Sequence, residues 1–303
     1  MSAVLETKFR GCLLGLAVGD AVGTTVEFKK RGDFAPVTDM TGGGPFGLEA
    51  GQWTDDTSMA LCLAESLTEQ GGFDPHDQMT RYVRWLREGH MSSTGTCFDI
   101  GYATETALHR FEEDGEPFAG STDPHSAGNG SIMRLAPIPL FYYPDTDAAV
   151  RYAGESSRTT HAARECIEAC QLFACLLVAA LDGREKDELL FDPANAQRME
   201  RSEKLRKIAR GEYAAKSEDE IRGSGYVVES LEAALWSFLH TDSYEDAILK
   251  AVNLGDDADT TAAVCGQIAG AFYGASGIPP RWLDKLYMRE EITGVALKLL
   301  ASG

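Results

Sequence analysis

The segment near the N-terminus that indicates the fold is Phe9-Arg10-Gly11-Cys12-Leu13-Leu14-Gly15-Leu16-Ala17. Its apolar residues recur at intervals of three and four, which places them on one face of an α-helix. The same spacing recurs in 59–67, 167–181, 227–239, 244–252, 262–273 and 292–300. The alternation of apolar and polar residues that is typical of strands is nearly absent. The sequence therefore predicts an all-α fold.

The composition limits the class of partner. The 303 residues include 28 Lys and Arg against 47 Asp and Glu, which gives a formal net charge of −19. Duplex nucleic acid is excluded as a partner, because its binders need a basic face that neutralises phosphates. At 44% hydrophobic residues the chain is not intrinsically disordered and can bury a sizeable core.

The cysteines and the apolar runs bear on location. Seven cysteines form no CxxC pair, which is typical of reduced thiols in a cytosolic protein. Lys8 and Arg10 before an apolar run mimic a signal peptide, but Glu6 and Asp20 interrupt that pattern. The longest uncharged apolar run, 169–181, is too short to span a bilayer. We expect a cytoplasmic protein with no membrane partner.

Domain organisation follows from the loops. Turn-rich stretches cover 41–51 and 112–130, and residues 183–225 are strongly charged, with a short amphipathic piece at 199–209. We expect the charged stretch to be a solvated surface excursion. Because the chemical motifs lie on both sides of it and need each other, we predict a single domain over 1–303.

The first of these motifs is Thr54-Asp55-Asp56-Thr57, directly before an apolar helix. One Thr or Asp would suffice to cap a helix N-terminus, a contribution of about 1 kcal/mol. Adjacent carboxylates repel one another unless a cation lies between them. The doublet is more than capping requires, although capping alone remains the alternative.

A second cluster, Gly255-Asp256-Asp257-Ala258-Asp259-Thr260-Thr261, opens another apolar helix. Oxygen ligands at this density suit Mg²⁺, Mn²⁺ or Ca²⁺ and not zinc, and the spacing is not that of an EF-hand. Capping is again the alternative. Two clusters of the same kind, both at helix starts, favour a binuclear metal site shared between them.

Four motifs occur in order along the chain: residues 10–23, Trp53-Thr54-Asp55-Asp56-Thr57, Gly128-Asn129-Gly130-Ser131-Ile132-Met133-Arg134 and Gly255-Asp256-Asp257-Ala258-Asp259-Thr260. Together they resemble the ADP-ribosylglycohydrolase family over nearly the whole chain. The resemblance implies an orthogonal helical bundle whose cleft holds two Mg²⁺ or Mn²⁺ ions, and hydrolysis of an ADP-ribosyl bond. The implied metal ligands are Thr54, Asp55, Asp56, Asp257, Asp259 and Thr260.

Three acidic residues have further expected roles. We expect the two ions to hold the ribose hydroxyls and activate a water that Asp56 orients. The family has a mobile glutamate near Glu27, which implies an acid/base or gating group there, with an exposed loop glutamate as the alternative. Family members usually carry Gly or Asn where this chain has Asp256, so we rank Asp256 below its neighbours as a ligand.

Within the family, three stretches are most similar to the members that release ADP-ribose from arginine: residues 95–101, 160–161 and 225–236. The resemblance suggests that Asp99 faces the arginine guanidinium, whose fork a carboxylate can hold by two hydrogen bonds. A helix N-cap is the alternative for Asp99. The expected substrate is an arginine-modified protein or a small ADP-ribose conjugate. Another linkage, such as O-acetyl or serine, and a non-catalytic ADP-ribose binder remain alternative functions.

The substrate side needs local positive elements, because ADP-ribose is a dianion and the protein is acidic. Backbone amides of Asn129, Gly130 and Ser131, in the motif that includes Met133, could cradle the diphosphate ahead of a helix. Glycines at 42–44 could let a loop approach the ribose closely. Ordinary turns are the alternative for both loops.

Two ring side chains complete the expected site. The resemblance implies a substrate-side histidine at His161, with a structural histidine as the alternative. Tyr226 could stack on a base or on the modified arginine, and a core aromatic is the alternative.

Overall fold

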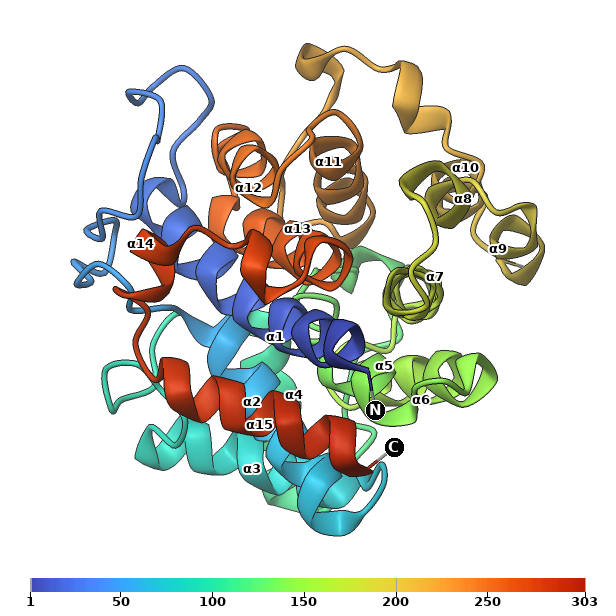
Figure 1. The fold of residues 1–303 in the computed structure, drawn as a ribbon. Coiled ribbons are helices and arrows are strands. Elements are labelled where there is room, and N and C mark those ends of the chain that lie inside the picture. The colour runs from blue at the N-terminus through green and yellow to red at the C-terminus, as the bar shows by residue number, and fades with distance from the viewer. Residues whose placement is uncertain (1, 200, 303) are drawn as a thin grey trace.

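The computed structural model describes residues 2–199 and 201–302 as a bundle of helices joined by loops (Figure 1). Over these ranges the only extended pairings are isolated bridges. The predicted all-α fold is confirmed, and the predicted helical faces at 227–239 and 244–252 coincide with whole helices.

The longer helices are α1 (Ala3–Gly23), α2 (Asp55–Gln70), α3 (Pro75–Glu88), α4 (Tyr102–Asp114), α6 (Thr146–Arg158), α7 (Arg164–Leu181), α11 (Val227–Leu239), α12 (Tyr244–Val252), α13 (Ala258–Tyr273) and α15 (Arg289–Ser302). The shorter helices are α5 (Pro137–Tyr142), α8 (Lys186–Leu190), α9 (Pro193–Arg198), α10 (Glu203–Ala209) and α14 (Pro280–Leu283). Single 3₁₀ turns are η1 (Thr24–Val26), η2 (Pro124–Ser126), η3 (Glu212–Ala215), η4 (Glu218–Glu220) and η5 (Ala275–Gly277).

Helices α1 and α13 form the central pair of the bundle (Figure 1). A glycine repeats at every fourth position of α1, and a Cβ at Gly11, Gly15 or Gly19 would lie 2.2–2.3 Å from a carbonyl oxygen of α13. The contacted residues run backwards along α13 as the glycines advance along α1, so the two helices are antiparallel. Only glycine permits this close approach.

The antiparallel pairing positions the functional end of the molecule. Gly23, at the end of α1, packs on the backbone of Ala258 and Asp259, at the start of α13. Because Asp20 of α1 bonds to the first turn of α2, that helix begins at the same place. The two acidic clusters are therefore brought together by the central helix pair.

Buried apolar side chains form a main core around α1, α7, α11 and α13, and a smaller cluster between α2, α3 and α4. By length and composition, the segment Ala3–Val26 could cross a membrane, but 89% of its apolar window is buried inside the protein. It therefore serves as a core helix in this structure.

The charged stretch 183–225 contains α8, α9 and α10 and packs beside α7 (Figure 1, olive to gold). Its apolar residues Leu189, Leu205, Ile208 and Tyr213 are buried in the main core. Lys186 also donates hydrogen bonds to the carbonyl oxygens of Phe238 (3.0 Å) and Thr241 (2.5 Å) at the end of α11. The stretch therefore exposes its charged side chains to solvent, while its apolar side chains and Lys186 attach it to the rest of the protein. The helix within the predicted amphipathic piece begins later than expected, at Glu203, after the N-cap Ser202.

Candidate metal and substrate site

The first acidic cluster opens α2, but a residue of another helix caps that helix. Asp20, fully buried on α1, accepts hydrogen bonds from the backbone N–H groups of Thr54 (2.8 Å) and Thr57 (3.1 Å) and from both threonine hydroxyls. Thr54 occupies the N-cap position without a capping bond from its own side chain. Asp20 thus replaces the usual cap and leaves the carboxylates of Asp55 and Asp56 available to another partner.

The second cluster opens α13 in a similar way. Asp257 is the N-cap residue without a capping bond, and its Oδ2 accepts a hydrogen bond from Asn129 Nδ2 at 2.8 Å. Asp259 and Thr260 follow in the first turn and are buried. For this helix too, capping does not explain the carboxylates.

The two clusters meet side by side. The hydroxyl of Thr54 lies 3.2 Å from an oxygen of Asp259 and 3.4 Å from one of Asp56, which in turn lies 3.4 Å from the Thr260 hydroxyl. The Thr54 hydroxyl has one proton and lies nearest to Asp20, at 2.9 Å. The carboxylates of Asp56 and Asp259 are therefore short of donors.

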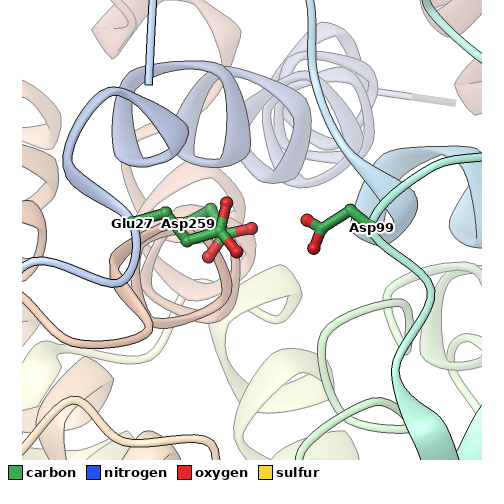
Figure 2. A group of neighbouring side chains, drawn as sticks. All are labelled: Glu27, Asp99 and Asp259. Carbon is green, nitrogen blue, oxygen red and sulfur yellow. The ribbon is translucent and has the colours of Figure 1, made fainter. Parts of the chain in front are cut away.

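Glu27 and Asp99 extend this cluster from two loops (Figure 2). Carboxylate oxygens of Glu27, Asp99 and Asp259 lie within 4.8 Å of one another, and the Asp99 carboxylate points across at the other two. Glu27 is only 3% exposed, which excludes the exposed-loop alternative. Asp99 is not a helix cap either, because the N-cap residue of α4 is Gly101.

Burial and mutual repulsion make the ionised cluster unstable by itself. Burial, followed by neighbouring carboxylates, raises the pKa of Asp55, Asp56 and Asp259 well above the usual range. The same causes raise the pKa of Glu27 to about 10 and that of Asp99 to about 8.

Three buried carboxylate oxygens in the cluster, Asp56 Oδ1, Asp259 Oδ1 and Glu27 Oε2, have no hydrogen-bond partner among the described residues. Such orphaned acceptors need a donor or a cation. The cluster offers only carboxylate and hydroxyl oxygens, the ligands preferred by hard divalent cations. The residues present therefore fit divalent cations.

Asp256 stands apart from its neighbours in the cluster. Its φ of +57° is left-handed and its side chain is exposed. Its backbone carbonyl accepts from Phe28 N–H and its N–H donates to the Lys29 carbonyl, both at 2.7 Å. This conformation favours Gly and Asn over other residues. Asp256 anchors the Glu27 loop through its backbone.

The loop Asn129-Gly130-Ser131 differs from the expected anion cradle. The N–H of Asn129 already donates to the Gly225 carbonyl at 3.1 Å, and the next helix, α5, begins only at Pro137. The N–H groups of Gly130 and Ser131 have no acceptor within the part of the chain that the structure describes. Met133 lies in the smaller core cluster and is 3% exposed.

His161 lies buried beneath this loop. A Cβ on Gly130 would lie 2.7 Å from the His161 ring, so the loop requires glycine there. Arg134 Nη2 donates to the Thr160 hydroxyl at 2.7 Å, and that hydroxyl lies 2.8 Å from His161 Nδ1. The hydroxyl proton therefore goes to Nδ1. Burial, with a smaller contribution from Arg134, lowers the pKa of His161 to about 3, so the ring is neutral.

Tyr226 stands at the start of α11 and lines a large cleft of about 1900 Å³. Its hydroxyl donates to Glu165 and accepts from Lys204 Nζ at 2.6 Å. Gly225 beside it adjoins the acidic cluster, since a Cβ there would lie 3.3 Å from Asp257 Oδ2. The cleft thus adjoins the acidic cluster at Gly225.

The glycines at 42–44, which were expected to approach a ribose, lie in a loop that packs on other backbone segments of the protein. A Cβ on Gly44 would lie 2.1 Å from the Thr24 carbonyl oxygen, and one on Gly42 would lie 2.5 Å from the Leu48 carbonyl oxygen. All three glycines have positive φ, and a Cβ on Gly43 would meet no atom within 4 Å among the described residues. Close packing within the protein accounts for Gly42 and Gly44 without a ligand.

Sequence reasoning did not assign a role to Asp20, although the residue lies inside the first motif. A carboxylate within an apolar helical stripe was the available signal, because a buried acid needs partners.

The fold and this site define a class of protein: all-α, with buried carboxylates gathered at two helix N-termini for divalent cations, beside a large cleft. A model of the family described as ADP-ribosylglycohydrolase matches residues 1–303. The chain belongs to the ADP-ribosylglycohydrolase family and is an enzyme of that class.

Individual relatives agree with this assignment. An ADP-ribosylarginine hydrolase, Tri1, from Pseudomonas putida (strain GB-1) is 50% identical over 292 residues, 96% of this chain and 77% of that protein. An ADP-ribosyl-(dinitrogen reductase) glycohydrolase from Rhodospirillum rubrum is 32% identical and covers 93% of this chain and 90% of its own. A solved structure described as an ADP-ribosylglycohydrolase-related protein complex superimposes with a TM-score of 0.86 at 46% identity and covers 98% of each chain.

Proposed function

We propose that this enzyme releases ADP-ribose from ADP-ribosylated arginine side chains of proteins and so reverses mono-ADP-ribosylation. The observation that carries the proposal is Asp99. Its carboxylate reaches the acidic cluster from a separate loop and stays partly exposed, so it could accept hydrogen bonds from the N–H groups of a leaving guanidinium. The names of relatives at 50% and 32% identity, which refer to ADP-ribosylarginine and to ADP-ribosyl dinitrogen reductase, support the same linkage.

The proposed cofactors are two divalent cations, Mg²⁺ or Mn²⁺. Their proposed ligands are Thr54, Asp55, Asp56, Asp257, Asp259 and Thr260. When bound, the cations supply Lewis-acid chemistry and positive charge at the ribose. The orphaned oxygens of Asp56 and Asp259 support this assignment.

The chain's own residues would then divide the work. Asp56 would take one proton from the attacking water as the water oxygen bonds to the anomeric carbon and the carbon–nitrogen bond breaks. Glu27 would give a proton to the departing nitrogen, so that the arginine leaves as its guanidinium. Asp99 holds the departing guanidinium, and Asp20 and Asn129 keep the Thr54 backbone and Asp257 in place through the hydrogen bonds described above.

The nucleotide would occupy the neighbouring cleft. Gly128 and Tyr226 line that cleft. The N–H groups of Gly130 and Ser131, which follow Gly128 in the chain, are the amides that a diphosphate could use. Lys204 Nζ lies 4.9 Å from the centroid of the Tyr226 ring, so the other face of that ring would serve a base. His161 supports the loop from below as a neutral ring and need not touch the substrate.

A panel of linkages tests the proposed function. Purified protein with Mg²⁺ or Mn²⁺ is incubated with arginine-linked and serine-linked ADP-ribosyl peptides and with O-acetyl-ADP-ribose, and released ADP-ribose is measured. We expect release from the arginine linkage first and at least 100-fold slower release from the others, since a charge-paired leaving group is worth several kcal/mol. Preference for another linkage, or no release at all, would contradict the proposal.

We also propose that the chain works as one domain in the cytoplasm. Seven free cysteines, six of them buried, suit a reducing compartment. Fractionation with a tagged full-length chain measures the location.

A further inference from the structure

Aromatic side chains border the acidic cluster. Phe28 follows Glu27 directly, Phe98 precedes Asp99 directly, and Phe46 lies between their rings. The ring centroids are 6.4 Å apart for Phe28 and Phe46 and 5.2 Å apart for Phe46 and Phe98. We call Phe28, Phe46 and Phe98 the aromatic rim. Because Phe28 is 68% exposed while Glu27 is buried, the rim lies towards solvent from the acids.

The backbone holds the rim in place at some cost. Phe28 has a φ of +63°, which an L residue adopts only when neighbouring contacts fix it. The two 2.7 Å hydrogen bonds between the Phe28–Lys29 segment and Asp256 provide that fixation. Phe46 stands in a tight loop closed by two hydrogen bonds between Gly43 and Leu48, at 2.7 and 2.9 Å. The exposed ring of Phe28 and the half-buried rings of Phe46 and Phe98, held in this way, point to a role other than core packing.

The cleft beside Tyr226 differs in charge from the acidic cluster. Among the described residues, its Arg110, Arg164 and Arg201 form no ion pair with a carboxylate. Of its acids, Glu165 and Glu203 form ion pairs, whereas Asp123 and Glu168 accept hydrogen bonds from backbone N–H groups. The cleft lining thus carries four acidic side chains and five cationic ones, Arg110, Arg164, Arg198, Arg201 and Lys204, and is slightly cationic in a protein of net charge −19.

The rim places ring faces beside carboxylates. The faces carry partial negative charge, and Glu27 and Asp99 adjoin Phe28 and Phe98 in sequence, while Lys29 follows Phe28 on its other side. An ADP-ribosylated arginine is anionic on the nucleotide side of the scissile bond and cationic on the other. Because Asp99 beside Phe98 suits a cation and the cleft lining is slightly cationic, the diphosphate would lie in the cleft and the guanidinium at the rim.

We infer that the aromatic rim binds the guanidinium and alkyl stem of the modified arginine and thereby selects arginine over neutral leaving groups. A guanidinium stacks on aromatic faces while a carboxylate holds its N–H groups, so Phe46 and Phe98 act together with Asp99. This inference rests on the proposed arginine-linked substrate.

Steady-state kinetics on an ADP-ribosylarginine peptide test the inference with full-length protein. Phe46→Leu and Phe98→Leu keep apolar bulk and remove the ring face, so KM should rise about 3- to 10-fold for each. Phe46→Trp should restore KM to within twofold of the parent. Phe118→Leu is the matched control, because Phe118 is a partly exposed ring stacked under Arg158 outside the rim. Its KM should not change.

Inhibition by free ADP-ribose, which lacks the leaving group, separates the rim from the cleft. The rim variants should keep the parent's inhibition constant within twofold. An unchanged KM in both leucine variants would overturn the inference, as would an equal loss of ADP-ribose inhibition, which would place the nucleotide base on the rim. A parent that releases ADP-ribose only from serine or acetyl linkages would instead refute the proposed function, and that result needs no variant.

Discussion

Single residues set the character of the acidic site, and Asp20 is the one with the widest effect. It accepts four hydrogen bonds from the segment that carries Asp55 and Asp56, although burial raises its own pKa to about 6. Those bonds fix the direction of the neighbouring carboxylates. In metal sites such supporting contacts are worth about 10- to 100-fold in metal affinity.

Asp20→Asn should therefore weaken Mn²⁺ binding about 10- to 100-fold and lower the free energy of unfolding by about 1–2 kcal/mol, because an amide accepts fewer bonds at the α2 N-terminus. Calorimetric titration with Mn²⁺ and urea unfolding measure the two effects. Wild-type affinity in this variant would show that Asp20 has no positioning role.

Asp256 gives the opposite expectation. Because its conformation is left-handed and its side chain exposed, Asp256→Asn should keep Mn²⁺ affinity within twofold and keep stability, whereas Asp256→Ala should cost about 1 kcal/mol. Urea unfolding and the same titration distinguish the two. A large loss of affinity in the asparagine variant would make Asp256 a ligand.

His161 predicts a pH dependence of stability. Its folded pKa of about 3 lies below the ordinary value near 6.5. Between these values the unfolded chain binds a proton that the folded protein does not, so stability falls as the pH falls below 6.5. Between pH 6.5 and 5, His161→Gln should lose about 1–2 kcal/mol less than the parent. Urea unfolding at both pH values gives the difference, and equal slopes would contradict a neutral buried ring.

At the scale of elements, the pairing of α1 with α13 decides where the site forms. Apolar periodicity in the sequence predicted both helices but not their contact, because periodicity reports a buried face and not its partner. The glycine repeat of α1 was the signal for this contact. In the structure these glycines let the backbone of α1 pack directly on the backbone of α13 at every turn.

Gly15→Ala should destabilise the fold by about 3 kcal/mol or more, since its Cβ would lie 2.3 Å from the Gly266 carbonyl oxygen. Gly294→Ala is the matched control, because Gly294 lies within α15 and a Cβ added there would meet no atom within 4 Å among the described residues. That control should gain up to about 1 kcal/mol. Thermal unfolding of both variants checks the contrast, and similar small effects would contradict close helix contact.

Loops were the elements that the sequence described least well. The motif 128–134 was expected to lead into a helix, but its Asn129 N–H is used by the Gly225 carbonyl, 96 positions later in the chain. Gly42 and Gly44 likewise pack against the backbone of Leu48 and Thr24, and this packing explains both glycines without a ribose. A contact between distant segments leaves no local periodicity, so these partners could not be read from the sequence.

At the scale of the whole molecule, charge is distributed by function. The net charge of −19 argues against duplex nucleic acid as a partner. The cleft lining nevertheless carries five cationic side chains against four acidic ones, while carboxylate oxygens without hydrogen-bond partners gather in the cluster, as far as the described residues extend. Family resemblance proposed metal ligands residue by residue, and that assignment stays a prediction. The charge of the cleft required the structure, because it depends on which residues from distant segments line the same wall.

The central claim is that both acidic clusters form one metal site that serves release of ADP-ribose from arginine. The most direct measurement is release from an ADP-ribosylarginine peptide by chelator-treated protein, before and after Mn²⁺ is returned, for the parent, Asp55→Ala and Asp257→Ala. We predict that chelation abolishes release, that Mn²⁺ restores it only in the parent, and that either variant loses at least 100-fold. Full release by chelated parent, or by both variants, would contradict the account.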